Sequence, residues 1–228
     1  MIPLAQAIQQ VRERIQQACL RSGRRPEEVL LVAVSKTVAG ERVQEALKAG
    51  LTHFGENYIQ EAEQKIESLK QGTWHFIGHL QSNKARQAVA LFSMIETLDS
   101  LNLARELNRR ALQAGKTIDV LVQVNEAGED TKSGLSPDQV QALLEESPSW
   151  TALRLRGLMS IPPYDPNPEK SRPWYRSLFQ WQQKWQQQFP NLDLGHLSMG
   201  MSHDFEVAIT EGATIIRVGT ALFGARGT

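Results

Sequence analysis

The stretch VLLVAVSK at residues 29–36 decides the fold class of this 228-residue chain. Its six consecutive apolar residues, rich in valine, are too few for a helix, and RSGRRPEE at residues 21–28 supplies a turn signal before them. Such a run predicts a short strand buried on both faces, as strands of parallel sheets are. Lys36 follows directly, so a cation stands at the carboxyl end of a buried strand.

Seven more strand-like segments follow, separated by helix-like segments, two of which end at the glycines Gly50 and Gly115. We predict strands at roughly 30–35, 52–55, 74–78, 94–98, 118–124, 154–160, 196–198 and 214–218. The first four begin 20 to 22 residues apart. Because parallel neighbours need a crossover connection, this rhythm indicates successive βα units.

Eight such units would close into one (β/α)8 TIM barrel, so we expect a single α/β domain over residues 1–228. An amphipathic helix precedes the first strand, with Leu4, Ile8, Val11 and Ile15 on one face. The alternative is an open doubly wound sheet, which the absence of a Gly-x-Gly-x-x-Gly turn after the first strand disfavours.

Composition excludes several functional classes. The 25 basic and 25 acidic residues cancel, whereas a protein that binds nucleic acid needs a basic excess. The single cysteine, Cys19, cannot form a disulfide within the chain, and its usage suits a reducing compartment. The longest apolar run is far shorter than a membrane span, and residues 1–14 do not resemble a signal peptide. We therefore expect a cytoplasmic protein without membrane or nucleic-acid partners.

Lys36 is the first candidate for chemistry. In this kind of barrel, side chains that act on a ligand stand where strands end at the carboxyl face. A lysine there either reaches water, pairs with an acid, or reacts. The reactive alternative is a Schiff-base lysine, because burial lowers the pKa of an ammonium group and frees the amine to attack an aldehyde.

Two further clusters follow the seventh and eighth predicted strands. LSMGMSHDFEVAI at residues 197–209 brings Ser198, Gly200 and Ser202 to a strand–helix junction, and IIRVGTALFG at residues 215–224 places Gly219 and Thr220 after the last strand. Each is compatible with a tight turn that needs glycine. Together they occupy the two loops that usually bind phosphate in such barrels.

Arg217 and the histidines complete the candidates. A guanidinium in an apolar strand needs an anion or a strong acceptor, so Arg217 indicates either a structural ion pair or a ligand contact. His75 and His79 lie four residues apart but lack an evident third ligand, so we expect no metal site. An imine-forming lysine, a phosphate cradle and a cation together suggest pyridoxal 5′-phosphate; the alternative is a phosphate-sugar enzyme in which Lys36 only pairs with an acid.

At these residues the sequence strongly resembles the pyridoxal phosphate homeostasis protein family (YggS/PROSC/PLPBP). The matching motifs span nearly the whole chain and are VAVSKT, HFGENYIQE, WHFIGHLQSNK, VNEAGEDTKSGL, RGLMSIP, LSMGMSHDFEVAI and TIIRVGTALFG. The resemblance implies a fold-type-III barrel like the N-terminal domain of alanine racemase, with Lys36 holding the cofactor as an aldimine.

Further site residues come from the resemblance alone. It implies that phosphate is bound by four residues, Ser198, Gly200, Gly219 and Thr220, with a backbone contact from Met199. Arg217 would face the pyridine nitrogen and make the ring a weaker electron sink than a carboxylate would. Asn57 and Ser82 would line the pocket, and Lys132 falls on a position that offers a secondary aldehyde contact.

The resemblance also sets the functional expectation. Alanine racemase adds a β-domain that supplies a second catalytic base in its dimer, whereas this sequence ends ten residues after Val218. A racemase that uses two bases needs them on opposite faces of the substrate. We therefore expect a monomer that binds the cofactor without robust turnover and serves vitamin B6 and amino- or keto-acid homeostasis, with cofactor-requiring enzymes as possible recipients. The alternative is a racemase or decarboxylase.

Overall fold

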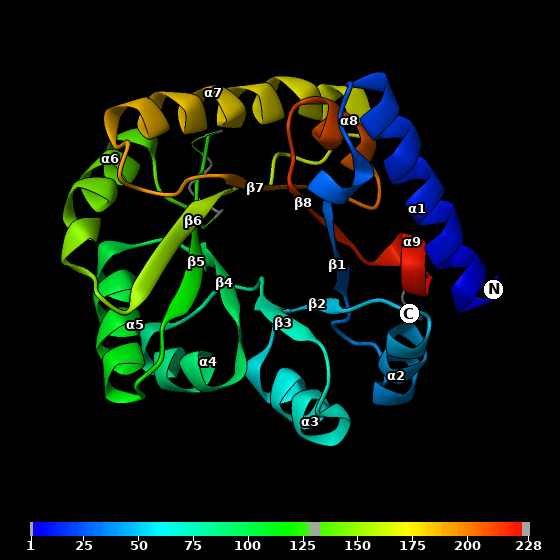
Figure 1. Cartoon of the computed structure of the whole chain (residues 1–228), viewed down its shortest axis with the longest axis horizontal. Coiled ribbons are helices and arrows are strands. Elements are labelled where there is room, and N and C mark those ends of the chain that lie inside the picture. Colours follow the sequence, from blue (N-terminus) through cyan, green and yellow to red (C-terminus); the bar gives the residue numbers. More distant parts are fainter. Residues whose placement is uncertain (1, 127, 129–132, 225–228) are drawn as a thin grey trace.

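Eight parallel strands close into one barrel in chain order, as predicted (Figure 1). The computed structural model describes residues 2–126, 128 and 133–224. The strands are β1 (Leu30–Val34), β2 (His53–Glu56), β3 (Thr73–Phe76), β4 (Met94–Leu98), β5 (Ile118–Gln123), β6 (Leu153–Met159), β7 (His196–Met201) and β8 (Ile215–Val218). Because β8 pairs in parallel with β1, the sheet has no free edge. The open-sheet alternative is therefore wrong.

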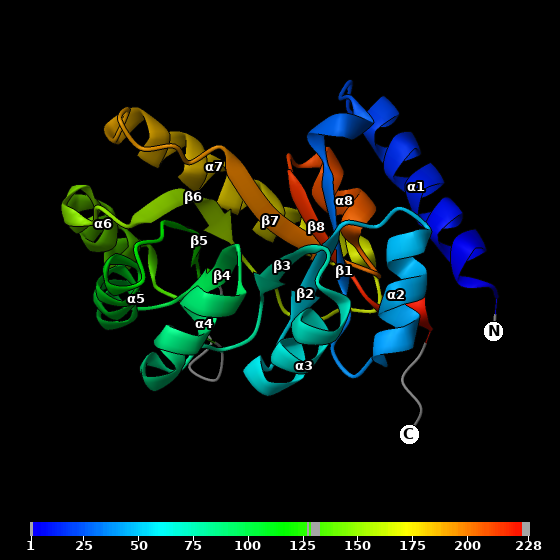
Figure 2. The ribbon, with the colours of Figure 1, turned by 60° about the horizontal axis from the view of Figure 1, so that its bottom comes forward.

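Helices surround the strands on all sides (Figures 1 and 2). They are α1 (Leu4–Arg21), α2 (Gly40–Lys48), α3 (Ile59–Leu69), α4 (Ala85–Leu91), α5 (Leu101–Gln113), α6 (Pro137–Glu146), α7 (Arg172–Gln188), α8 (Phe205–Thr210) and α9 (Thr220–Phe223). Short 3₁₀ turns lie at Pro26–Glu28, Ser82–Lys84, Ser147–Ser149 and Pro168–Ser171. The predicted additional helix, α1, lies along α8 and α9. None of the described helices is long and apolar enough to cross a bilayer.

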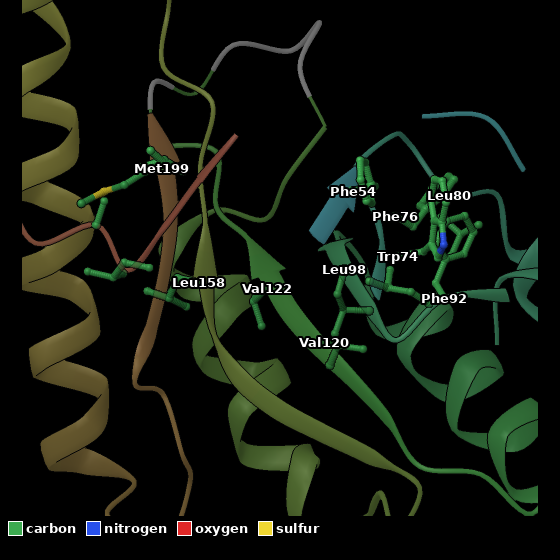
Figure 3. Packing of buried hydrophobic residues seen from close by; sticks show 14 of the residues in the cluster. Phe54, Trp74, Phe76, Leu80, Phe92, Leu98, Val120, Val122, Leu158 and Met199 are labelled. Atoms are coloured by element: carbon green, nitrogen blue, oxygen red, sulfur yellow. The ribbon is translucent and has the colours of Figure 1, made fainter. Parts of the chain in front are cut away.

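The main hydrophobic core lies between the barrel and its helices. Alternate strand residues face outward and pack there, because successive side chains of a strand point to opposite faces. Phe54, Trp74, Phe76 and Phe92 form one aromatic part of it (Figure 3), with the Phe54 and Trp74 rings 5.2 Å apart. Each such side chain stabilises the fold by roughly 1.5–3 kcal/mol when fully buried.

A second, smaller apolar cluster fills part of the barrel interior. It consists of Val32, Met94, Leu121, Met159 and Ile215, which come from five strands. Charged and polar side chains of β3, β4, β7 and β8 lie among the inward-facing residues as well. The interior therefore divides into an apolar part and a polar part, and the polar part leads to the candidate site.

Candidate functional site

The candidate site lies where the strands end. Lys36 follows β1, Asn57 follows β2, and Gly219 follows β8. Because β1 pairs with both β2 and β8, Lys36 stands between the other two along the rim. Lys36 lies in a tight turn and is half-buried. The strand pattern predicted this placement for Lys36 and Gly219, and the family resemblance implied that Asn57 lines the pocket.

A cavity of about 230 Å³ opens at this end of the barrel. Its lining comes from the ends of β2 to β6 and from α7: Asn57, Ile77, Gly78, His79, Thr97, Gln123, Val124, Asn125, Glu126, Ser133, Ser160, Ile161, Pro162, Pro163 and Trp174. Within the described part of the chain, three buried oxygen atoms of this lining have no hydrogen-bond partner: Asn57 Oδ1, Glu126 Oε1 and Ser160 Oγ. Buried polar atoms are normally paired, so the cavity offers these polar atoms to a ligand.

Glu126 gives the cavity an unusual carboxyl group. Burial raises the pKa of Glu126 to about 7, although a hydrogen bond with Ser177 opposes the rise. Desolvation disfavours the charged form of a carboxyl group. Near neutral pH this side chain can therefore either donate or accept a proton.

Arg217 projects into the polar part of the barrel interior, where it is almost completely buried. Its Nη1 donates to Ser198 Oγ at 2.5 Å, and its Nη2 donates to the Ser160 carbonyl at 2.9 Å. Glu96 Oε2 lies 3.9 Å from Nη1. The acceptor that the sequence required for Arg217 is therefore present, and its partner Ser160 also lines the cavity.

Glu96 is the counter-charge at the centre of this network. It accepts hydrogen bonds from Ser198 Oγ at 2.5 Å and from His75 Nδ1 at 2.7 Å. Full burial raises its pKa, but the hydrogen bond and charge of His75, the charge of Arg217 and the Ser198 hydroxyl together lower it below its ordinary value. His75 Nε2 in turn lies 3.0 Å from His53 Nδ1. Glu96 is therefore held as a carboxylate opposite Arg217.

Ser198 lies deeper in the barrel than the sequence suggested. The strand prediction ended at residue 198, whereas β7 continues to Met201. This extension leaves Ser198 wholly buried inside the barrel, where its hydroxyl bonds Glu96 and Arg217. Met199, the next residue, points outward into the main core (Figure 3).

Ser202 is the serine that reaches the rim. Its Oγ accepts hydrogen bonds from the backbone N–H groups of Gly219 at 3.1 Å and Ala221 at 3.2 Å. The turns after β7 and β8 therefore meet at the start of α9, where Thr220 is exposed. The sequence placed these two turns in one pocket, and the structure does bring them together.

Gly200 allows the β7 turn to pack closely on α8. Its φ of +92° lies in the region that favours glycine, and an added Cβ would lie 2.5 Å from Ala208 Cβ and 2.9 Å from Phe205 Cα. Asp204 stabilises the same turn by accepting from the Met201 N–H at 2.8 Å. Glycine is required here by helix packing, which is one of the two alternatives that the sequence left open.

The remaining predicted residues lie in different surroundings. Ser82 begins a 3₁₀ turn, accepts a hydrogen bond from Asn102 at 3.3 Å and is not among the cavity-lining residues. His79 lines the cavity and bonds Asp99, and the described ranges contain no cluster of three metal-ligating side chains. Lys132 lies outside the described residues.

The sequence analysis named Ser202 as part of the phosphate-loop cluster but did not identify Glu96 or Glu126. Glu96 could have been suspected as a carboxylate within the strand MIETL. No signal in the sequence distinguished Glu126, because its raised pKa depends on which side chains surround it.

The residues present fit pyridoxal phosphate. The cavity offers the unpartnered Ser160 hydroxyl as a donor, the junction of the β7 and β8 turns offers the Ser202 hydroxyl, and Lys36 stands on the same rim. A ligand with an aldehyde, a phosphate and a polar ring matches this set of groups.

Comparison with known proteins identifies the family. Residues 7–227 match the model of the alanine racemase N-terminal domain. The pyridoxal phosphate homeostasis protein of Aquifex aeolicus is 46% identical over 96% of both chains. The chain belongs to the pyridoxal phosphate homeostasis protein family. The pyridoxal phosphate homeostasis protein of Escherichia coli is 39% identical over 99% of this chain and 98% of its own.

Solved structures agree with the family assignment. PipY of Synechococcus elongatus, solved with pyridoxal phosphate bound, superposes with a TM-score of 0.83 at 40% identity and covers 94% of this chain and 100% of its own. An alanine racemase of Clostridium difficile shares the fold, with a TM-score of 0.72 at 15% identity over 95% of this chain and 56% of its own. The expected barrel resembling the racemase N-terminal domain is therefore confirmed.

Proposed function

We propose that this protein binds pyridoxal 5′-phosphate at the carboxyl end of its barrel, through Lys36, and contributes to intracellular homeostasis of that cofactor. The observation that carries the proposal is the position of Lys36 on the rim, between Asn57 after β2 and the Gly219 turn after β8. The family relatives named as pyridoxal phosphate homeostasis proteins support it, as does the PipY structure with the cofactor bound.

The phosphate group belongs at the junction of the β7 and β8 turns. There Ser202 Oγ accepts hydrogen bonds from the N–H groups of Gly219 and Ala221, which leaves the hydroxyl hydrogen of Ser202 to donate to the phosphate. The loops after the last two strands are the usual phosphate site of such barrels. We assign Ser202, Gly219 and Thr220 to phosphate binding. Met199 and Gly200 belong to the stretch of β7 backbone that leads to Ser202. Ser198 holds Arg217 in place.

We assign Arg217 to a contact with the nitrogen of the cofactor ring. When bound, the cofactor supplies an aldehyde that reacts with amines and a ring that accepts electrons. Arg217 remains a cation, held by Ser198 and the Ser160 carbonyl and balanced by Glu96. A fixed cation does not protonate the ring nitrogen, which keeps the ring a weak electron sink. Asn57 lines the cavity together with Ser160, the residue whose carbonyl binds Arg217.

A weak electron sink suits binding without robust turnover, and we extend the proposal to that property. The protein would act in the cytoplasm as a monomer, as a carrier or buffer of the cofactor whose recipients are cofactor-requiring enzymes. Incubation with single amino acids in heavy water tests the absence of turnover. We expect no rapid deuterium uptake at Cα; rapid uptake would make the protein a racemase or decarboxylase.

Covalent attachment is tested with Lys36→Ala. The wild-type protein mixed with pyridoxal phosphate should absorb in the visible range, and borohydride reduction followed by peptide mapping should label Lys36. The variant should lose both signals, whereas Lys48→Ala, which removes an exposed lysine of α2, should keep them. Label on another lysine would refute Lys36 as the attachment point, and a protein that never takes up the cofactor would favour a phosphate-sugar enzyme.

A further inference from the structure

A buried charged cluster lies behind the Lys36 turn, on the outer side of the barrel. Lys65 of α3 donates from Nζ to Glu56 Oε1 at 2.7 Å and to Glu61 Oε1 at 2.6 Å. Side-chain exposure is 7% for Lys65 and zero for Glu56. Charged groups are almost never buried this deeply unless they are paired, so the cluster is a built feature of the fold.

The cluster holds the chain on both sides of Lys36. Before it, the Ser35 carbonyl accepts from Lys65 Nζ at 2.6 Å, and the Ser35 hydroxyl donates to Glu56 Oε1 at 2.7 Å. After it, the Thr37 N–H donates to Glu61 Oε1 at 2.5 Å. Lys65 and Glu61 thus fix the two peptide units that flank Lys36, and Glu56 fixes the side chain of Ser35.

The backbone of the turn needs such support. Thr37 has a φ of +63°, in the left-handed region that a β-branched residue rarely adopts. A conformation of this kind persists only where the surroundings over-determine it, and such conformations gather at functional sites. The hydrogen bond from the Thr37 N–H to Glu61 is a direct restraint of that kind.

We propose that Lys65, Glu56 and Glu61 are positioning residues that fix the Lys36 turn and thereby orient the Lys36 amine toward the aldehyde of its ligand. The inference rests on the proposed function, because it takes Lys36 as the attachment point. In the step concerned, the nitrogen of the neutral amine forms a bond to the aldehyde carbon, and the aldehyde oxygen leaves as water with the two amine hydrogens. An amine held at the correct angle reacts faster than one that must search for it.

A purely structural role is the competing explanation, since the cluster also attaches α3 to the barrel. The two explanations differ in what the variants should change. A structural brace would alter stability and leave the reactivity of Lys36 alone. A positioning device would slow attachment of a large, oriented ligand and leave attack on a small aldehyde unchanged.

Glu61→Ala is the decisive variant, because Glu61 is half-buried at the edge of the cluster and its removal leaves the Glu56–Lys65 pair in place. Glu61→Gln retains an acceptor for the Thr37 N–H and serves as the conservative variant. Glu67→Ala, at an exposed position of the same helix, is the matched control. Lys65→Met is the stronger but riskier change, because it leaves Glu56 buried without a cation.

Two rates are measured on cofactor-free protein: uptake of pyridoxal phosphate by absorbance, and reductive methylation of Lys36 by formaldehyde and borohydride, located by peptide mapping. For Glu61→Ala we expect cofactor uptake to be about tenfold slower or more, with methylation unchanged. Glu61→Gln and Glu67→Ala should resemble the wild type.

Wild-type uptake at Glu61→Ala would overturn the inference while leaving the proposed function intact. Equal slowing of uptake and methylation would also overturn it, because the cluster would then set the nucleophilicity of the amine and not its orientation. If the wild-type protein itself takes up no cofactor, the proposed function fails first. Should Lys65→Met not fold, the two Glu61 variants still decide the question.

Discussion

The inside of the barrel and the layer between barrel and helices are built on different principles. The outer layer is an almost continuous apolar core that also holds the Lys65 cluster and the buried side chain of Asp204. The interior combines a small apolar cluster with the hydrogen-bonded series Arg217, Ser198, Glu96 and His75. Apolar packing needs only the right size and pattern, whereas a buried polar series needs every partner in place.

This difference explains how the two regions serve the site. The outer layer stabilises the barrel and, through Lys65, holds the turn of Lys36 from behind. The interior supplies a fixed cation, Arg217, beneath the carboxyl end of the barrel. Variants that remove single members of the interior series should therefore lower the free energy of unfolding by more than most changes in the outer layer do.

The largest effect is expected from Arg217→Met. It leaves Glu96 fully buried without its cation, and breaking a buried pair in this way costs about 3–5 kcal/mol of unfolding free energy. Urea denaturation measures the loss. The double variant Arg217→Met with Glu96→Leu should recover much of it, because neither charge then remains buried. A double variant as unstable as the single one would show that the pair does not interact as described.

Gly200→Ala should have the next largest effect, and it perturbs the rim instead of the interior. The added Cβ would stand 2.5 Å from Ala208 Cβ at a φ of +92°. Backbone strain and overpacking together predict a loss of about 2–4 kcal/mol. Gly115→Ala is the control, since its φ of +61° brings similar strain but no atom lies within 4 Å. Equal losses for both would mean that contact with α8 contributes nothing.

The same contrast decides what the sequence could predict. The strands are short apolar runs that alternate with helical segments at regular spacing, and all eight strands were predicted from this local pattern. Partners across the interior, such as Glu96 for Arg217, are about 120 residues apart and depend on barrel closure, so no local pattern reveals them. The end of β7 was missed because Gly200 suggests a turn, which kept Ser198 at the rim in the prediction while the strand carries it inside.

Position along a strand was sufficient to predict which residues stand at the carboxyl end of the barrel. Lys36 lies two residues after β1 and Gly219 directly follows β8, as the strand pattern predicted, whereas Asn57 was expected there from the family resemblance alone. The charges behind Lys36 were not foreseen, since Glu56 and Lys65 belong to different elements whose contact arises only when α3 packs on the barrel.

Glu126 provides a pH test of the rim. Its pKa is raised by burial from 4.5 to about 7, so the folded state prefers the neutral form. The stabilisation of the folded state by the neutral Glu126 is therefore full below pH 4.5 and is lost as the pH rises through about 7. Relative to Glu126→Gln, the wild type should lose on the order of 1–3 kcal/mol of unfolding free energy over this range. Parallel pH profiles of the two proteins would contradict the assignment.

The smallest effect concerns the surface, where two ion pairs of similar geometry join different helices. Arg14 of α1 makes two hydrogen bonds to Glu206 of α8, at 2.6 and 2.8 Å, and also lies 4.3 Å from the Phe205 ring. Arg105 of α5 makes two bonds to Glu146 of α6, at 2.7 and 2.6 Å, but its side chain is 62% exposed against 39% for Arg14.

Arg14→Ala should therefore cost about 0.5–1 kcal/mol and Arg105→Ala less, because the first change also removes packing against an aromatic ring. Thermal unfolding in low salt and in concentrated sodium chloride separates the contributions. Salt screens the charge of both pairs, so the difference between the two variants should persist at high salt. If it vanishes there, the ring contact adds nothing and α1 is attached to α8 by charge and by its apolar face alone.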